Sequence, residues 1–114
     1  MVPFETAEAT IPQIHAAFAS GEISCVGLVA GYLDRIDAYD DQGPELNAIL
    51  TVNPRALEVA AALDARYAAD ADGVGPLHCI PVIVKDNFDT ADLPTTGGSV
   101  TLAESYPLDD AFIV

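Results

Sequence analysis

The chain contains one lysine, Lys85, at a position that could support proton transfer. Lys85 directly follows the apolar run Ile80–Val84, which is typical of a strand buried on both faces. Ligand sites in α/β folds collect at the ends of such strands. Partial burial penalises the ammonium ion and so lowers a lysine pKa. A lysine that is neutral near working pH can act as a general base.

Two other uses of Lys85 fit the same position. The side chain could extend to solvent and pair with Asp86 or Asp89, and position alone favours this interpretation. A Schiff base to a carbonyl cofactor ranks last, because nothing else in the sequence suggests a phosphate cradle. The flanking sequence must therefore decide between these uses.

The elements that would position Lys85 follow from apolar periodicity and end signals. The sequence predicts helices over about 11–20, 24–40 and 54–69, with Thr10 and Gln13 forming a capping box for the first and Ser24 capping the second. Apolar runs predict strands over about 46–52 and 79–84. Residues 85–99 form a loop. This order indicates an α/β layered fold for residues 1–114, which by their length are either one domain or a fragment of a larger one.

Composition and charge narrow the function classes. The net charge is −14, from 18 acidic and four basic residues. Such a surface repels phosphates and anionic lipids, so we expect neither a nucleic acid nor a membrane as partner. No apolar stretch approaches a membrane span of about 20 residues, and the acidic N-terminus is unlike a secretory signal. These features predict a cytoplasmic protein.

The cysteines and histidines show no metal-binding pattern. Cys25 and Cys79 are far apart in apolar surroundings and match no metal spacing, so free buried thiols are expected. His15 and His78 are each isolated in the sequence. We therefore predict no metal site.

A contiguous block around Lys85 reverses the interpretation that position alone favours. The segment from Gly75 to Ser99, GPLHCIPVIVKDNFDTADLPTTGGS, resembles the lysine-bearing block of the amidase signature family. That block is a G-x-P-hydrophobic-x-V-K-D strand followed by a D-T-x-x-x-P-T-T-x-G-S loop. The region from Ser24 to Asp64 is similar to the family's N-terminal helices and first strand.

The resemblance implies a fold, a reaction and a set of site residues. The fold is an α/β/α layered one with a mixed central sheet, incomplete in this chain. The reaction is amide hydrolysis by a serine nucleophile that a cis-serine bridges to a lysine base, with no cofactor or metal. Lys85 is implied as the base. The implied supporting loop comprises Asp86, Asn87, Thr95, Thr96, Gly97, Gly98 and Ser99.

The resemblance also implies what this chain lacks. Both catalytic serines of the family lie in a later Gly/Ser-rich stretch that has no counterpart here. Ser99 matches the loop serine, so we expect its hydroxyl to bond nearby backbone. The chain alone should be inactive and poorly soluble, and a complementary C-terminal chain or a homo-oligomer is an expected partner. The alternatives are a non-catalytic interaction module and the A-subunit type of glutamyl-tRNA amidotransferase. The small amide substrate is unspecified.

Overall fold

A computed structural model describes residues 3–114 of the chain, which separate into two compact parts. The helical unit comprises Met1–Ala48 and Pro54–Pro81, of which Pro3 onward is described. The loop unit comprises Ile49–Asn53 and Val82–Val114. Each unit has its own internal contacts.

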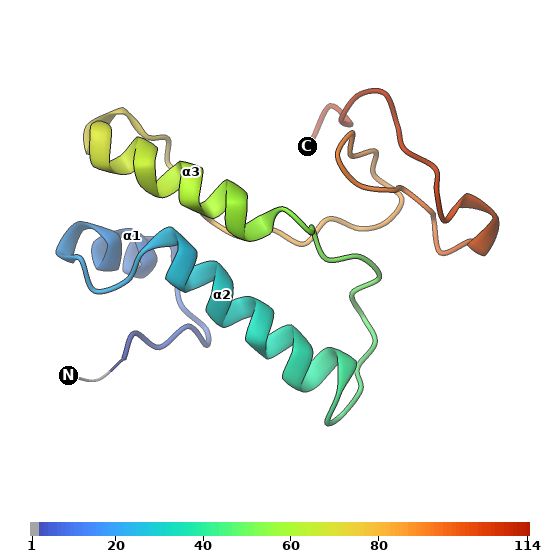
Figure 1. The fold of residues 1–114 in the computed structure, drawn as a ribbon, viewed down its shortest axis with the longest axis horizontal. Coiled ribbons are helices and arrows are strands. Elements are labelled where there is room, and N and C mark those ends of the chain that lie inside the picture. Colours follow the sequence, from blue (N-terminus) through green and yellow to red (C-terminus); the bar gives the residue numbers. More distant parts are fainter. Residues whose placement is uncertain (1–2) are drawn as a thin grey trace. The chain divides into compact units, whose positions relative to one another are not determined.

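The helical unit is built from three α-helices (Figure 1): α1 over Ile11–Ser20, α2 over Cys25–Arg35 and α3 over Ala56–Ala69. A π-helical stretch, Ile36–Asp41, continues α2. A short 3₁₀ turn, Ala71–Gly73, follows α3. Helices α2 and α3 lie against each other.

Local signals fix the ends of α1 and the start of α2. Thr10 Oγ1 accepts the Gln13 N–H at 3.3 Å, and Gln13 Oε1 accepts the Thr10 N–H at 2.9 Å, which confirms the capping box. Gly21 ends α1 with a φ of 75°, a left-handed conformation that glycine adopts without a Cβ clash. Ser24 caps α2 by accepting the Gly27 N–H at 3.0 Å.

Helix α3 begins two residues later than its sequence signals suggest. The expected range is 54–69, yet Pro54 and Arg55 form a turn before the helix starts at Ala56. Arg55 occupies the N-cap position without a side-chain cap hydrogen bond. Its guanidinium instead pairs with the Glu58 carboxylate at 2.8 Å. The first turn is therefore tied by an exposed ion pair, which contributes little to stability.

The core of the helical unit is small. Its buried apolar side chains come from all three helices and from residue 79: Ile14, Phe18, Cys25, Leu28, Ala60 and Cys79. The small Ala60 on α3 lets that helix approach Leu28, the largest side chain with no exposed surface. The apolar stripe of α2 thus faces the core, as an amphipathic helix requires.

Cys25 and Cys79 form a disulfide, so the expectation of free thiols is wrong. The two residues are 54 positions apart, and their Cα atoms lie 5.9 Å from each other. Two turns in 75–80 bring Cys79 to the start of α2: the His78 N–H donates to Gly75 O at 3.1 Å and the Ile80 N–H to Leu77 O at 3.1 Å. Sequence separation hid this proximity because it depends on how the chain returns after α3.

The two expected strands, 46–52 and 79–84, are absent: residues 3–114 contain no β-strand. Both segments are irregular. Val82 and Ile83 are 73% and 80% exposed, so this apolar run is not buried on both faces as expected. A strand forms only where a neighbour accepts and donates its ladder hydrogen bonds. The described residues offer no such neighbour, and the mixed sheet is not formed.

The loop unit consists of turns and one 3₁₀ helix, Val100–Leu102. Backbone hydrogen bonds tie its segments together: the Thr95 N–H donates to Ser105 O at 2.8 Å, and the Ala111 N–H donates to Asp89 O at 2.8 Å. The Asp110 carboxylate also accepts the Ala91 N–H at 2.8 Å. Residues near 90 are thereby held to those near 110.

Candidate functional site: the Lys85 loop

Lys85 lies in the loop unit at the start of a turn. Its carbonyl oxygen accepts the Phe88 N–H at 3.0 Å, which closes the turn through Asp86 and Asn87. The Lys85 side chain is exposed. Within residues 3–114 neither Asp86 nor Asp89 forms a salt bridge with it, so the surface-pair interpretation has no support from these contacts.

Asp86 holds the loop that follows Lys85. Its carboxylate accepts the Thr96 N–H at 2.9 Å, the Gly98 N–H at 3.2 Å, and a short hydrogen bond from the Thr96 hydroxyl. The backbone carbonyl of Asp86 accepts the Gly97 N–H at 2.8 Å. Residues 96–98 are thus fastened to the residue next to Lys85.

The hydrogen bonds to Asp86 also set its charge state. The Thr96 hydroxyl, followed by the Thr96 backbone N–H, lowers the pKa of the Asp86 carboxyl below its usual value, while partial burial opposes this shift. Hydrogen bonds to an ionised carboxylate favour the charged form. Asp86 is therefore an anion at neutral pH.

The two glycines of the loop adopt left-handed backbone conformations, with φ of 57° at Gly97 and 78° at Gly98. A side chain at either position would strain the backbone even though open space surrounds the Cβ position. This conformation turns the Gly98 N–H toward the Asp86 carboxylate. The Gly-Gly pair is thus required by the turn itself.

Thr95 and Ser99 complete the loop in different ways. Thr95 Oγ1 donates to Phe88 O and accepts the Thr90 N–H, each at 3.3 Å, so this hydroxyl shapes the loop. The Ser99 backbone N–H donates to Thr96 O at 2.9 Å. Ser99 sits at the N-cap of Val100–Leu102, where its hydroxyl makes no capping hydrogen bond. The expected backbone-bonding role of the Ser99 hydroxyl stays a prediction.

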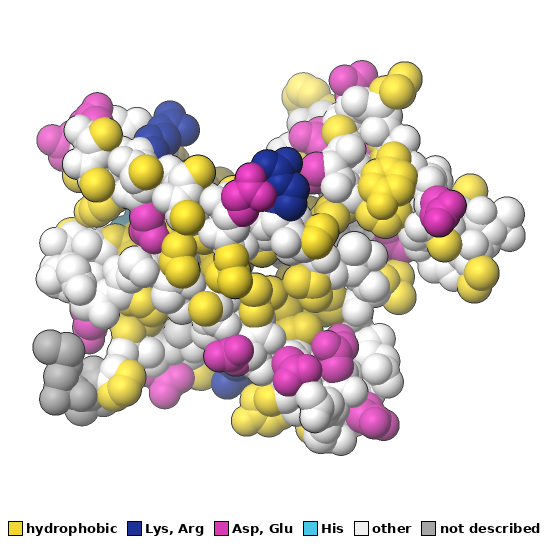
Figure 2. Space-filling model, viewed as in Figure 1, with side chains coloured by type: hydrophobic (Ala, Val, Ile, Leu, Met, Phe, Trp, Pro, Cys, Tyr) yellow, Lys and Arg dark blue, Asp and Glu magenta, His cyan; other side chains and the backbone are white. Residues whose placement is uncertain are grey.

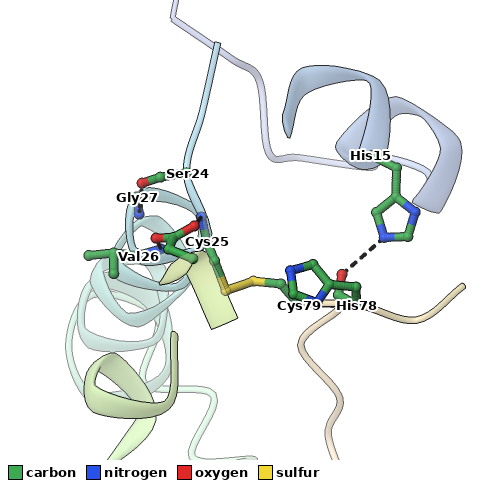
Figure 3. The surroundings of a disulfide bond; sticks show 8 residues. His15, Ser24, Cys25, Val26, Gly27, His78 and Cys79 are labelled. Carbon is green, nitrogen blue, oxygen red and sulfur yellow. Dashed lines mark hydrogen bonds between the residues drawn. A yellow bond between two sulfur atoms is a disulfide. The ribbon is translucent and has the colours of Figure 1, made fainter. Parts of the chain in front are cut away.

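A second constellation lies in the helical unit and involves both histidines, for which the sequence indicates no role. His15 Nε2 lies 2.9 Å from the His78 carbonyl oxygen (Figure 3). The His78 ring stacks on Tyr67 at 5.7 Å and meets Phe18 edge-on at 6.4 Å. The pKa of His78 is lowered, first by burial and then by the neighbouring His15. His15 lies three residues before Phe18 on α1, which is the sequence signal that could have placed it against the core.

Metal binding has no visible basis in the part of the chain that the structure describes. Residues 3–114 contain no group of three His, Cys, Asp or Glu side chains suited to hold a metal ion. Likewise, none of the helices in these residues is long and apolar enough to span a membrane.

The chain is similar in sequence to proteins of one known family. The family model described as Amidase matches residues 27–114. A putative amidase of Schizosaccharomyces pombe is 42% identical over 110 residues, which cover 94% of this chain and 18% of that protein. The glutamyl-tRNA(Gln) amidotransferase A-subunit from Thermobifida fusca is 47% identical over 91 residues, covering 79% of this chain and 18% of that protein.

Solved structures agree with the sequence matches. Peptide amidase from Stenotrophomonas maltophilia superposes with a TM-score of 0.85 at 41% identity, over 95% of this chain and 22% of that one. An amidase family protein from Bacillus anthracis gives a TM-score of 0.88 at 34% identity, over 96% of this chain and 21% of that one. The chain thus spans about a fifth of the length of these relatives. Since the matched region includes Lys85 and its loop, the chain belongs to the amidase family.

Proposed function

We propose that the chain supplies the general-base lysine, Lys85, of an amide-bond hydrolase that is complete only when the rest of the amidase fold is present. The observation that carries this proposal is the match of residues 27–114 to the amidase family, with Lys85 inside the matched block. The supporting contacts are those by which Asp86 fastens residues 96–98 beside Lys85. The substrate would be a small amide.

Amide hydrolysis needs a nucleophile that this chain does not provide. A serine hydroxyl attacks a carbonyl only when an adjacent base takes its proton. The serines outside the Lys85 loop have structural contacts or no base nearby: Ser24 caps α2, and Ser20 Oγ donates to Ala17 O at 3.1 Å. We infer that Lys85 takes its proton from a serine outside these 114 residues, through a bridging serine. The chain alone is then inactive.

The exposed apolar surface of the loop unit fits a missing structural partner. Its exposed large apolar side chains include Val82, Ile83, Val100, Leu108, Phe112 and Ile113. In Figure 2, hydrophobic side chains are visible at the surface among scattered acidic ones. We propose that the remainder of the amidase fold covers these side chains, in the same polypeptide or in a complementary chain. Segments 46–52 and 79–84 would then become strands of the mixed sheet. Left uncovered, such patches favour association, so poor solubility or a homo-oligomer is expected in isolation.

A chimera tests this function. Residues 27–114 replace the matching segment of peptide amidase from Stenotrophomonas maltophilia, to which the chain superposes closely. We expect the chimera to hydrolyse peptide amides. Lys85→Ala should lower kcat by about 10³-fold or more, as removal of one member of a catalytic triad does. Arg66→Ala serves as the matched control, because it also removes one positive charge but lies on α3, outside the Lys85 loop. A folded chimera whose activity is equal with and without Lys85 would refute the proposal.

The glutamyl-tRNA amidotransferase A-subunit type is a second candidate because the Thermobifida fusca protein of that type is 47% identical to this chain. The net charge of −14 disfavours direct contact with tRNA, since phosphates are repelled. A chimera built on the Thermobifida fusca protein distinguishes the two candidates. Restored amidotransferase activity there, together with an inactive peptide-amidase chimera, would favour the second. An interaction module with no catalytic role remains the outcome if neither chimera is active.

A further inference from the structure

The Cys25–Cys79 disulfide joins a helix of the core to the segment that precedes Lys85 in the sequence. Cys25 is the first residue of α2, and Cys79 lies in the turn six residues before Lys85 (Figure 3). Both residues are buried, with 1% and 7% of their surface exposed. The bond therefore ties the start of a core helix to the segment that leads into the Lys85 loop.

The backbone at Cys79 shows that a cysteine is costly there. Its φ is 53°, in the left-handed region where a Cβ meets the neighbouring backbone. Cys79 also stands at the glycine position of the G-x-P-hydrophobic-x-V-K-D pattern, and glycine adopts this φ without strain. A cysteine at this position replaces an unstrained residue by a strained one. The compensating feature in the structure is the bond to Cys25.

Hydrogen bonds from α3 hold the start of α2, where Cys25 lies. The Asp64 carboxylate, from α3, accepts the N–H of Cys25 at 2.7 Å and that of Val26 at 3.0 Å. The Cys25 backbone is thereby held by contacts that do not depend on the bond to Cys79. A fixed partner lowers the cost of bringing the two sulfurs together, because less chain freedom is lost when the bond closes.

We propose that Cys25 and Cys79 form a redox couple that controls the stability of the helical unit. Two thiol groups of a reductant break the S–S bond: together they supply two electrons and two protons, become joined as a disulfide, and leave two cysteine thiols. Residue 79 then loses its covalent bond to α2 and keeps its strained φ. An oxidant of the disulfide class reverses the step. The couple acts on the helical unit whether or not Lys85 is catalytic.

The size of the ring sets the expected effect. The bond spans a sequence separation of 54 residues. Closing a ring of this size raises the folding equilibrium constant about 10³-fold in the chain-entropy treatment. In a cytoplasm kept reducing by thiols, the pair would be open and would close under oxidative conditions. The burial of both sulfurs means that exchange requires local opening first, so we expect slow reduction of the folded chain.

Thiol counting and proteolysis of the 114-residue chain test the proposal. The chain is equilibrated with oxidised or reduced glutathione, then alkylated under denaturing conditions and weighed by mass spectrometry. We expect no alkylated cysteine after oxidation and two after reduction. Two free thiols, or a chain dimerised through its cysteines, after oxidation would overturn the proposal.

Trypsin cleavage after Arg35 and Arg66 then reports opening of the helices. Reduction should accelerate both cleavages by at least about tenfold, up to the ~10³-fold that ring closure allows. A Cys25→Ala/Cys79→Ala variant should be cleaved at one rate in both buffers, as fast as the reduced chain. The comparison of the oxidised and reduced unaltered chain tests the proposal even if this variant does not fold. Equal cleavage rates of the oxidised and reduced unaltered chain would contradict the proposal.

Discussion

Removal of the Asp64 carboxylate should release the start of α2 from α3. Asp64 accepts two backbone N–H groups, those of Cys25 at 2.7 Å and Val26 at 3.0 Å. These are among the first N–H groups of α2, which have no partner within the helix. The carboxylate also lies at the positive end of the helix dipole. Asp64→Ala removes both interactions at once.

The magnitude follows from the hydrogen bonds and their exposure. A hydrogen bond to a charged group contributes about 1.5–3 kcal/mol, and replacing a helix cap by alanine typically costs about 1 kcal/mol. Because Asp64 is only partly buried, water replaces some of the lost bonding. We therefore expect Asp64→Ala to lower the free energy of unfolding by about 2–3 kcal/mol. Asp64→Asn keeps an acceptor oxygen and should lose about 1 kcal/mol.

Urea unfolding of the oxidised chain at low micromolar concentration, followed by circular dichroism, gives these energies. Asp34→Ala is the matched control, since Asp34 is an exposed acid on α2 and its loss changes the net charge equally. Its unfolding midpoint should hardly move. Hydrogen exchange of the Cys25 and Val26 amides should accelerate in Asp64→Ala. If both variants unfold at the same urea concentration, the carboxylate does not hold the two helices together.

Three further perturbations probe the core, the histidine pair and the loop. Leu28→Ala should cost about 3 kcal/mol because Leu28 is fully buried, with Asp34→Ala again as reference, and a loss under 1 kcal/mol in urea unfolding would contradict the assigned core. The pKa of His78 is lowered by burial and by His15, with Arg66 lowering it further and Asp64 opposing the shift. The neutral His78 ring therefore contributes stability above its ordinary pKa near 6.5, and this contribution is lost as the pH falls below that value. His78→Asn should then flatten the fall in melting temperature between about pH 7 and 5.5, and an unchanged slope would count against this origin. Asp86→Asn should speed hydrogen exchange at Thr96 and Gly98 several-fold, whereas Asp92→Asn in the same unit should leave those amides unchanged.

The sequence predicts the helical unit well because its signals are local. A capping box needs only Thr10 and Gln13, and the stripe through Cys25 and Leu28 is a property of one helix. The late start of α3 shows the limit of such signals. Asn53 and Pro54 satisfy the rules for a helix start, yet the first helical residue is Ala56. End signals therefore place a helix more reliably than they fix its first residue.

Contacts between residues that are far apart in the sequence could not be predicted from local patterns. The disulfide needs α3 and the turns of 75–80 to bring Cys79 to Cys25, and no spacing rule encodes that path. The contact between His15 and His78 has the same origin. The cysteine pair lies in the core, and the rings of both histidines lie beside the core residue Phe18. The left-handed φ at Cys79 does have a sequence signal, since Cys79 stands at the glycine position of the G-x-P-hydrophobic-x-V-K-D pattern.

The two strands expected over 46–52 and 79–84 do not form among the described residues because these residues offer no partner strand, although the sequence signal for them is real. Val82 and Ile83 have the β-branched, apolar character of a central strand and are nonetheless mostly exposed. A fully buried strand needs neighbours on both edges and layers on both faces. The same requirement applies to Lys85, whose side chain is exposed. If a covering layer buried Val82 and Ile83, it would also partly desolvate the lysine at the end of that run. Burial of this apolar run and the neutral form of Lys85 that the proposed reaction requires would thus arise from the same covering layer.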